Sequence, residues 1–364
     1  MRYLVKYVFT FFVLIFQILH VNSQENPQLR LLFAGDIMGH DTQIESAKKQ
    51  GQGTYDYTDC FMHLERFISA ADIAIGNLEV TLAGAPYKGY PAFSSPDELA
   101  LELKEVGFDI MVHANNHAID RRKKGLERTL VVLDSIDMIH SGVFKDAEQR
   151  AIHYPLIVEK NGIRLALLNY TYGTNGIKVT SPNIVNYIDT VQIKKDLRKA
   201  CTAEPDFIIA LMHWGLEYQR TENKAQQALA KFLFENGTDA IIGSHPHVVQ
   251  PIRMLNENNL VVYSMGNMIS NQRKRYTNGG ILVELTLEKS DSTYITDYSY
   301  LPIWVYKPRN NYGTAFQLLP AAIDSAWQAE LDMDTTAAAS MMQFVKDTRE
   351  NLEGNKEMDW EFGE

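Results

Sequence analysis

The chain has 364 residues, of which 45% are hydrophobic and 22% charged, a composition that fits a globular protein with a sizeable core and excludes a disordered chain. Its formal net charge of −10 disfavours nucleic acid as a partner, because the phosphates would on average be repelled. The two cysteines, Cys60 and Cys201, show no spacing that demands a disulfide, and we expect both in the core.

The first 23 residues have the pattern of a secretory signal peptide. Arg2 and Lys6 precede a short apolar run, and small or polar residues follow up to Ser23, as in cleaved export signals. The run is short for a membrane span, which needs roughly 20 apolar residues. We therefore expect export to the periplasm, the cell surface or the medium, with cleavage near Ser23. The alternative is a protein that residues 8–19 anchor in the membrane, which would be its one membrane contact.

Six short apolar runs, each ending in polar residues, predict buried strands. In chain order these runs are 29–34, 71–75, 108–112, 207–212, 239–243 and 260–265. Amphipathic segments between some of them predict helices, and these segments are 95–107, 124–136 and 223–237. Strands that alternate with helices are typical of an α/β protein with much parallel sheet.

Two later stretches predict antiparallel strands. Asn161-Gly162, a dipeptide typical of hairpin turns, is flanked by two strand-like runs, and residues 279–306 contain another long pair. We therefore expect an α/β (α+β) fold with one mixed sheet or two sheets. From about residue 320 the pattern becomes helical. The expected organisation is one domain over residues 29–320, followed by a helical C-terminal extension over residues 321–364.

Chemically active side chains follow the predicted strands at their carboxyl ends, where ligands bind in open α/β sheets. They are Asp36, His40, Asn77, Glu79, Asn115, Asn116, His117, His213, His245, His247 and Asn267. Gathering carboxylates and imidazoles at one edge costs hydration and places like charges close together. A divalent cation relieves both costs, because it neutralises carboxylates and accepts imidazole lone pairs. The pattern therefore predicts a site for one or two metal ions.

The segment "GSHPHVVQP", residues 243–251, places one proline between His245 and His247. Proline favours extended geometry in the residue before it, and side chains at i and i+2 of an extended chain point the same way. We therefore expect both rings to face the metal site together. The alternative is a pair of hydrogen-bonded histidines in a turn. His213 and the acidic strand ends favour the metal.

Other reaction classes find less support in the sequence. It contains no Gly-x-Ser-x-Gly elbow and no glycine-rich phosphate loop, which disfavours a serine hydrolase and a P-loop protein. The loop "NQRKRY", residues 271–276, follows the last strand end. Two interpretations of it stay open. Arg273 and Arg275 bind an anionic substrate at the cleft, or they lie on an ordinary charged surface.

The ordered set "GDIMGH", "GNLEV", "ANNHAID", "HWGLEY", "GSHPHVVQP" and "YSMGN" resembles bacterial capsule-synthesis proteins of the CapA type. That family is associated with poly-γ-glutamate and looks like a branch of the calcineurin-like metallophosphoesterases. The resemblance covers roughly residues 29–305. It implies two mixed sheets packed face to face, with helices outside in a four-layer αββα arrangement, and a metal site at one edge.

The resemblance also implies a role for each site residue. The first metal would be bound by Asp36 and His247, the second by Asn116, His213 and His245, and both by Glu79. His117 would act near the leaving group, with Asp120 as its orienting partner. Apart from the resemblance, we expect substrate contacts from Asn77, Asn115, Asn267, Arg273 and Arg275. Met38 stands where phosphoesterases of the wider superfamily usually have a histidine, so His40 would have to replace it.

Metal-assisted hydrolysis is the activity that these features favour, with two divalent ions, Mn, Fe or Zn, bound by mixed nitrogen and oxygen ligands. The bond would be a phosphoester or an amide, in a small molecule or in an anionic envelope or capsule polymer, and other capsule-assembly proteins are expected partners. One alternative is a non-catalytic accessory protein that binds or guides an anionic polymer during export or attachment. A second alternative is a structural α/β protein with scattered histidines.

Overall fold

The computed structural model describes residues 26–49, 51–256, 258–310, 313–321, 331 and 333–359. The predicted signal peptide or anchor, residues 1–23, lies outside the described residues, and so does part of the predicted C-terminal extension. Within the described ranges, no helix combines the length and the apolar character that crossing a bilayer requires.

Strands make up most of the regular structure. They are β1 (Gln28–Ile37), β2 (Ile73–Leu78), β3 (Ile110–Val112), β4 (Ile139–Ser141), β5 (Val143–Phe144), β6 (Leu156–Lys160), β7 (Ile163–Thr171), β8 (Ile184–Val185), β9 (Phe207–His213), β10 (Ala240–Ser244), β11 (Ile252–Asn256), β12 (Asn259–Val262), β13 (Asn267–Ile269), β14 (Gly279–Lys289), β15 (Thr293–Tyr306), β16 (Arg309–Asn310), β17 (Gly313–Thr314) and β18 (Gln317–Pro320). The helices are α2 (Asp41–Ala47), α3 (Thr58–Phe61), α4 (Glu65–Ile68), α5 (Glu98–Glu105), α6 (Arg122–Ser135), α7 (Ala147–His153), α8 (Thr190–Cys201), α9 (Lys224–Glu235) and α11 (Thr335–Asn351).

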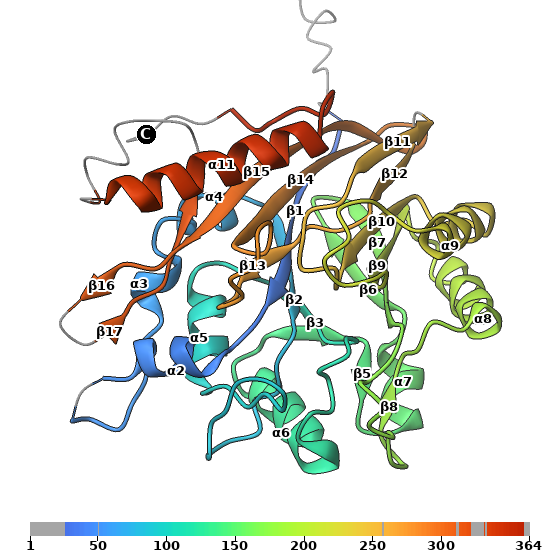
Figure 1. Ribbon diagram of the computed structural model, residues 1–364. Helices are drawn as coiled ribbons and strands as arrows, with labels where there is room; N and C mark the ends of the chain where they lie inside the picture. The colour runs from blue at the N-terminus through green and yellow to red at the C-terminus, as the bar shows by residue number, and fades with distance from the viewer. Residues whose placement is uncertain are drawn as a thin grey trace, which may run out of the picture.

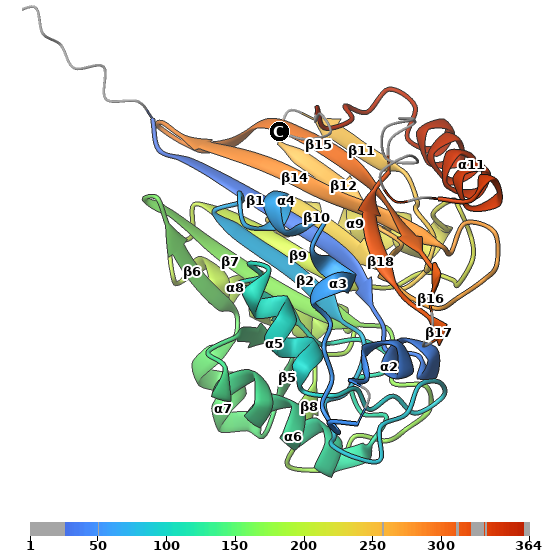
Figure 2. The same cartoon turned by 90° about the vertical axis from the view of Figure 1, so that its left-hand side faces the viewer.

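Two mixed sheets form the centre of the molecule (Figure 1, Figure 2). The first sheet has the strand order β18-β15-β14-β1-β2-β3-β4, with β13 also paired to β1, and the second has the order β11-β12-β10-β9-β7-β6. In the second sheet the central strands run parallel, and β11 and β6 are antiparallel at its edges. In the first sheet β1 to β4 run parallel up to one edge, and β14, β15 and β18 are antiparallel on the other side. All six predicted strand runs belong to these sheets, and the expectation of a mixed α/β fold is confirmed.

The alternation of side chains along β1 builds two of the layers. Phe33 points into the core between the sheets, where it meets residues such as Leu165 of β7 and Ile209 of β9. Its neighbour Leu32 points to the other face, into the core shared with Leu103 of α5. This is the period of two expected for a strand that is buried on both faces.

Helices cover the outer faces of both sheets. Figure 1 shows α8 and α9 beside the second sheet, where Leu197 and Leu233 pack against its strands. On the first sheet, Phe344 of α11 packs against Trp304 of β15 and Leu319 of β18. The arrangement is therefore helix, sheet, sheet, helix, and α11 lies in the stretch where the sequence predicts a helical extension.

Local signals explain where several elements begin and end. The predicted hairpin joins β6 and β7, and its turn residues Asn161 and Gly162 have φ values of 51° and 75°, which suit the tight turns of hairpins. Helix α9 begins at a capping box in which the Asn223 side chain accepts from the Gln226 backbone. It ends just before Gly237, which has φ 95°, as expected where a helix stops.

The cysteines differ from the expectation. Cys60 is buried in the core between α3 and the first sheet, but Cys201 is exposed, and neither forms a disulfide. Cys201 is the last residue of α8, which buries Ile193, Leu197 and Ala200. The helix ends there, so its final residue faces solvent.

Candidate metal centre

The carboxyl ends of strands from both sheets meet at one place. Asp36 on β1 is in register with Asn77 on β2 and with Asn267 on β13, and His213 at the end of β9 is in register with Ser244 on β10. Two sets of buried side chains there have possible ligand atoms within 4.8 Å of one another. We call them the Asp36 group, which contains Asp36, Glu79 and His247, and the His213 group, which contains Glu79, His213 and His245.

Glu79 belongs to both groups. Its side chain is fully buried, and neither carboxylate oxygen has a hydrogen-bond partner among the residues that the structure describes. Burial, followed by the nearby charge of Asp36, raises the pKa of Glu79 well above its usual range. A buried carboxylate without a donor is costly, and a divalent cation between the two groups would remove that cost. The donor set therefore fits the metal site that the sequence predicts.

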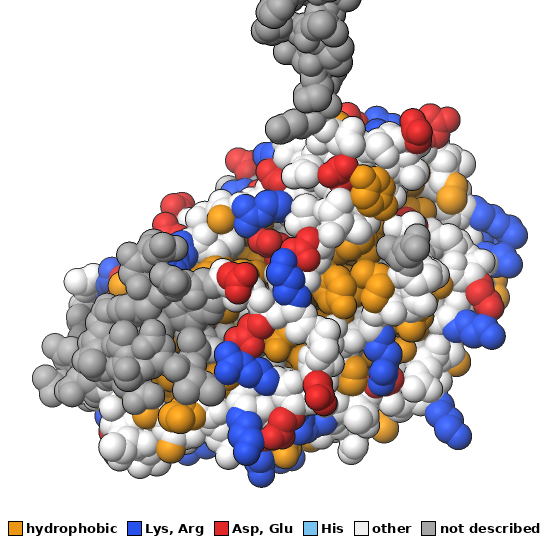
Figure 3. All heavy atoms as spheres, turned by 90° about the horizontal axis from the view of Figure 1, so that it is seen from above, with side chains coloured by type: hydrophobic (Ala, Val, Ile, Leu, Met, Phe, Trp, Pro, Cys, Tyr) orange, Lys and Arg blue, Asp and Glu red, His pale blue; other side chains and the backbone are white. Residues whose placement is uncertain are grey.

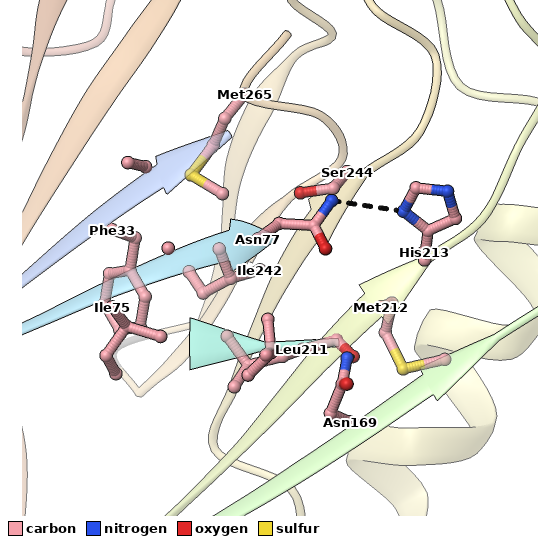
Figure 4. A pocket seen from close by; sticks show the side chains of 13 residues that line it. Phe33, Ile75, Asn77, Asn169, Leu211, Met212, His213, Ile242, Ser244 and Met265 are labelled. Atoms are coloured by element: carbon pink, nitrogen blue, oxygen red, sulfur yellow. Dashed lines mark hydrogen bonds between the residues drawn. The ribbon is translucent and has the colours of Figure 1, made fainter. Parts of the chain in front are cut away.

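His213 is positioned by amides on two sides. Its Nε2 lies 3.0 Å from Asn116 Oδ1 and 3.6 Å from Glu79 Oε1, while its Nδ1 lies 3.3 Å from the Asn77 side-chain nitrogen (Figure 4). Burial and the neighbouring histidines, His245 foremost, hold the pKa of His213 well below its usual range. A neutral imidazole is the form that binds a metal, and the amide oxygen of Asn116 lies beside it.

The backbone around His245 and His247 is not extended, so that expectation is wrong. Their φ values are 102° and 59°, and their ring centroids lie 6.0 Å apart with the planes at 56°. The backbone N–H of His245 points at both oxygens of Asp36, 3.3 Å away, so the chain turns around that carboxylate. The two rings consequently belong to different groups.

The ring of His245 has an unsatisfied nitrogen. Its Nδ1 is buried without a partner among the described residues. Burial and the proximity of His247 lower the pKa of His245 to about 3, so the ring is neutral at physiological pH and its lone pair is available to a cation.

The predicted substrate-binding asparagines lie next to the predicted ligands. Asn77 donates to Asp36 Oδ1 at 2.8 Å, and Asn267 Oδ1 lies 3.0 Å from His247 Nδ1. Asn115 donates to the backbone oxygen of Leu78 at 2.8 Å. All three side chains are buried. In this geometry they orient the groups around them, and direct contact with a substrate stays a prediction.

His117 and Asp120 form a hydrogen-bonded pair beside the two groups. His117 Nδ1 lies 2.8 Å from Asp120 Oδ2, and the same oxygen accepts from the backbone of Phe93 at 2.8 Å. The Phe93 ring meets the His117 ring edge-on at 4.7 Å between centroids. The imidazole is therefore held in one orientation.

His40 and the two arginines lie outside the two groups. His40 Nδ1 is 3.0 Å from Gln43 Oε1 at the start of α2, and burial lowers the pKa of His40 to about 4. Arg275 forms an ion pair with Asp347 of α11 at 2.8 Å. Asp347 is 72 residues further along the chain, so no local pattern predicts this pair.

Two tyrosines that were not among the predicted site residues lie over the histidines. The Tyr172 ring lies 4.4 Å from that of His245, and the Tyr218 ring lies 6.2 Å from that of His247. Both are more than a third exposed. The sequence could have indicated both tyrosines. Each lies within five residues of the carboxyl end of a strand at this edge, as the predicted site residues do.

A close contact between two glycines holds Asp36 in place. The Asp36 backbone donates to Gly266 O at 3.0 Å. A Cβ on Gly35 would lie only 2.1 Å from that same oxygen, so only glycine fits at position 35. Gly266 itself has φ 72°, which glycine adopts at no steric cost.

The chain is similar in sequence to known capsule biosynthesis proteins. The family model described as bacterial capsule synthesis protein PGA_cap matches residues 30–272, a range that includes both groups. The capsule biosynthesis protein CapA of Bacillus anthracis is 29% identical over 79% of this chain and 71% of its own length. The PGA biosynthesis protein CapA of Bacillus subtilis is 26% identical over 88% of this chain and 87% of its own length.

Among solved structures, the calcineurin-like phosphoesterase YfkN of Bacillus subtilis aligns with a TM-score of 0.44, at 15% identity over 89% of this chain and 98% of that one. The family assignment rests on the sequence match instead, which spans more than half of the chain. The chain therefore belongs to the bacterial capsule synthesis protein PGA_cap family.

Proposed function

We propose that the protein is an exported, metal-dependent hydrolase that cleaves a phosphoester or an amide bond in capsule or cell-envelope metabolism. The observation that carries this proposal is Glu79, a buried carboxylate without a hydrogen-bond partner among the described residues, shared by two groups of ligand atoms. A carboxylate shared in this way is what a pair of neighbouring cations needs.

The Asp36 group and the His213 group contain the residues that would hold the ions. Asp36, Glu79 and His247 would hold one, and Glu79, His213 and His245 would hold the other, with the Asn116 oxygen beside His213. Mixed nitrogen and oxygen donors suit Mn, Fe or Zn. When bound, such ions polarise the oxygen of the scissile group and lower the pKa of water, which makes a nucleophile at neutral pH.

His117 is the residue best placed to move a proton. Its Nδ1 faces Asp120 at 2.8 Å, which leaves Nε2 for the substrate. The Asp120 carboxylate stabilises the protonated ring, and Phe93 fixes its orientation. From Nε2 the ring would donate a proton to the leaving oxygen or nitrogen, as a general acid does.

The proposed substrate class rests on the family. The relatives are named for biosynthesis of a capsule and of PGA, so we infer an anionic polymer, or a small phosphorylated or amide compound, as the substrate and other capsule-assembly proteins as partners. The alternative, an accessory protein that guides the polymer without cleaving it, draws on Met38 and on the position of His40 outside both groups.

The test combines elemental analysis with an activity screen. The mature protein, expressed without residues 1–23, should hold divalent metal and hydrolyse a generic phosphodiester with added Mn²⁺. Glu79→Gln and His213→Ala should lose both properties, whereas His153→Ala, an exposed histidine on α7, should keep them. Full turnover by His213→Ala would contradict the proposal. Polymer binding that persists in a chelator, without any hydrolysis, would favour the accessory role.

A further inference from the structure

Positive charges without acidic partners collect beside the Asp36 group. They are Arg273, Lys274 and Lys307, and none of them takes part in an ion pair among the described residues, whereas Arg275 in the same loop is paired with Asp347. The face in Figure 3 shows acidic and basic side chains interspersed. What distinguishes these three from other unpaired cations among the described residues, such as Lys194 and Lys195 on α8, is their position beside the candidate metal centre.

Lys307 is the most constrained of the three. It follows β15, and its Nζ donates to the backbone oxygen of Gln272 at 3.1 Å and lies 5.6 Å from the centre of the Phe316 ring. Burial and the nearby charge of Arg273 lower the pKa of Lys307 to about 8. Holding two like charges close together, one of them partly buried, costs free energy that no carboxylate in the described chain offsets.

A short chain of contacts connects Lys307 to the metal centre. Lys307 bonds Gln272, whose Oε1 accepts from Asn267 Nδ2 at 3.1 Å. Asn267 Oδ1 in turn lies 3.0 Å from His247 Nδ1. On the other side of the loop, Lys274 Nζ lies 3.9 Å above the Tyr218 ring, and that ring lies 6.2 Å from His247. The cations therefore flank the Asp36 group.

The geometry points to an oxyanion-binding site formed by Lys307, Arg273 and Lys274 next to the Asp36 group. This site holds a phosphate or carboxylate of the substrate, while the bond to be cleaved lies at the metal centre. A bound oxyanion would neutralise the cations and use the N–H donors that Lys307 and Arg273 have left. The inference deepens the proposed function, on which it depends for the role of the site, and it moves the predicted contact from Arg275 to Lys307 and Lys274.

The experiment measures anion binding without turnover. Inorganic phosphate and glutarate are titrated by calorimetry into the mature protein after the metal has been removed by a chelator. We expect at least one of them to bind, and Lys307→Gln and Arg273→Gln to weaken that binding about fivefold or more. Lys307→Arg should retain it, because the charge is kept. The probe that binds more tightly identifies the source of the oxyanion as a phosphoester or a carboxylate polymer.

A matched control is Lys231→Gln, which removes one exposed cation from α9 and should bind like the wild type. Circular dichroism confirms that each variant is folded, and Arg273 is exposed enough that its substitution should not disturb the core. The inference is overturned if the metal-free protein binds neither anion, or if the Lys307 and Arg273 variants bind as tightly as the wild type. Intact, Lys307-dependent binding without any hydrolysis would count against the proposed function alone.

Discussion

Two buried carboxylates show how the chain handles the same physical problem in two regions. Asp196 on α8 accepts at Oδ2 from Arg150 Nη2 at 2.6 Å and from the Tyr170 hydroxyl at 2.9 Å, and Gln192 donates to its Oδ1 at 3.0 Å. Glu79 is buried at least as deeply, yet neither of its oxygens has a hydrogen-bond partner in the described part of the chain.

The difference separates a carboxylate that supports the fold from one that is kept available. Taking a charge out of water costs several kcal/mol, and a partner with good geometry offsets that cost. Asp196 has its cation in the sequence, whereas Glu79 is surrounded by histidines whose burial favours the neutral form. The comparison teaches that the absence of hydrogen-bond partners, rather than burial, distinguishes the carboxylate that we propose as a metal ligand.

The largest expected effect tests Glu79 directly. Glu79→Gln keeps the size of the side chain and removes its charge, so we expect loss of metal and a fall in activity of about 1,000-fold or more, about 4 kcal/mol. The metal-free variant should nevertheless be more stable than the metal-free wild type at neutral pH. Elemental analysis and a turnover assay measure the loss of metal and activity, and urea unfolding in the presence of a chelator measures the change in stability.

The expected sign of this stability difference follows from the direction of the pKa shift of Glu79. Because folding raises the pKa of Glu79, its stabilising contribution is complete below the unfolded pKa and is lost as the pH rises toward the folded value. The free energy of unfolding of the metal-free variant should therefore exceed that of the metal-free wild type by more as the pH rises. If Glu79→Gln instead destabilises the metal-free protein at every pH, the side chain is held like Asp196 and the comparison fails.

The second effect concerns the other carboxylate. Arg150→Met leaves Asp196 buried without its cation, and we expect a loss of about 3 kcal/mol in the free energy of unfolding, with the metal content unchanged. Lys231→Met breaks only an exposed pair with Glu235 and should cost less than about 1 kcal/mol. Equal costs for the two variants would mean that Arg150 does not carry the burial of Asp196.

A third prediction sharpens the role of a carboxylate that has a partner inside the site. Asp120→Asn should lower kcat about 100-fold, about 2.7 kcal/mol, because the amide stabilises the protonated His117 ring poorly. The pH profile of kcat should also change, since the ring loses its carboxylate partner. Metal content should stay at the wild-type level. A variant with normal kcat and a normal pH profile would show that Asp120 is purely structural.

The smallest expected effect concerns Asp239, a carboxylate with fewer hydrogen-bond partners than Asp196 and more than Glu79. Burial raises the pKa of Asp239 to about 6, although its Oδ2 accepts from the Ile208 backbone at 2.7 Å. Stability should therefore fall as the pH rises from about 4 to 6, and Asp239→Asn should remove about 1–2 kcal/mol of that fall. Asp206→Asn, which removes a carboxylate that accepts from the Arg164 backbone on the neighbouring strand, is the control in pH-dependent urea unfolding.

The fold was predictable to the extent that its signals are local. Apolar runs such as 207–212 and the Asn161-Gly162 turn predicted strands and a hairpin that the structure contains. Whether the strands form one sheet or two depends on packing between segments such as β1 and β7, which no short window of sequence contains. Exposure of Cys201 likewise depends on where α8 ends.

The site followed from one rule, that parallel strands end at a common edge. This rule brought Asp36, Asn77 and His213 together correctly in space, although their roles stay predictions. The rule could not predict the backbone conformation of His245. The chain turns there around the carboxylate of Asp36, which is more than two hundred residues earlier in the chain. The rule also gave no sign of Lys307, which does not follow a strand of the parallel set.

The contact between Gly35 and Gly266 has a consequence for how this family can diverge. A methyl group at position 35 would meet the oxygen that anchors Asp36, and the strand could respond only by moving away from the loop before β13. The new Cβ would also lie 3.2 Å from the Met265 side chain, at the edge of the core between the sheets. A relative with a larger residue there could keep the architecture intact and yet be chemically silent.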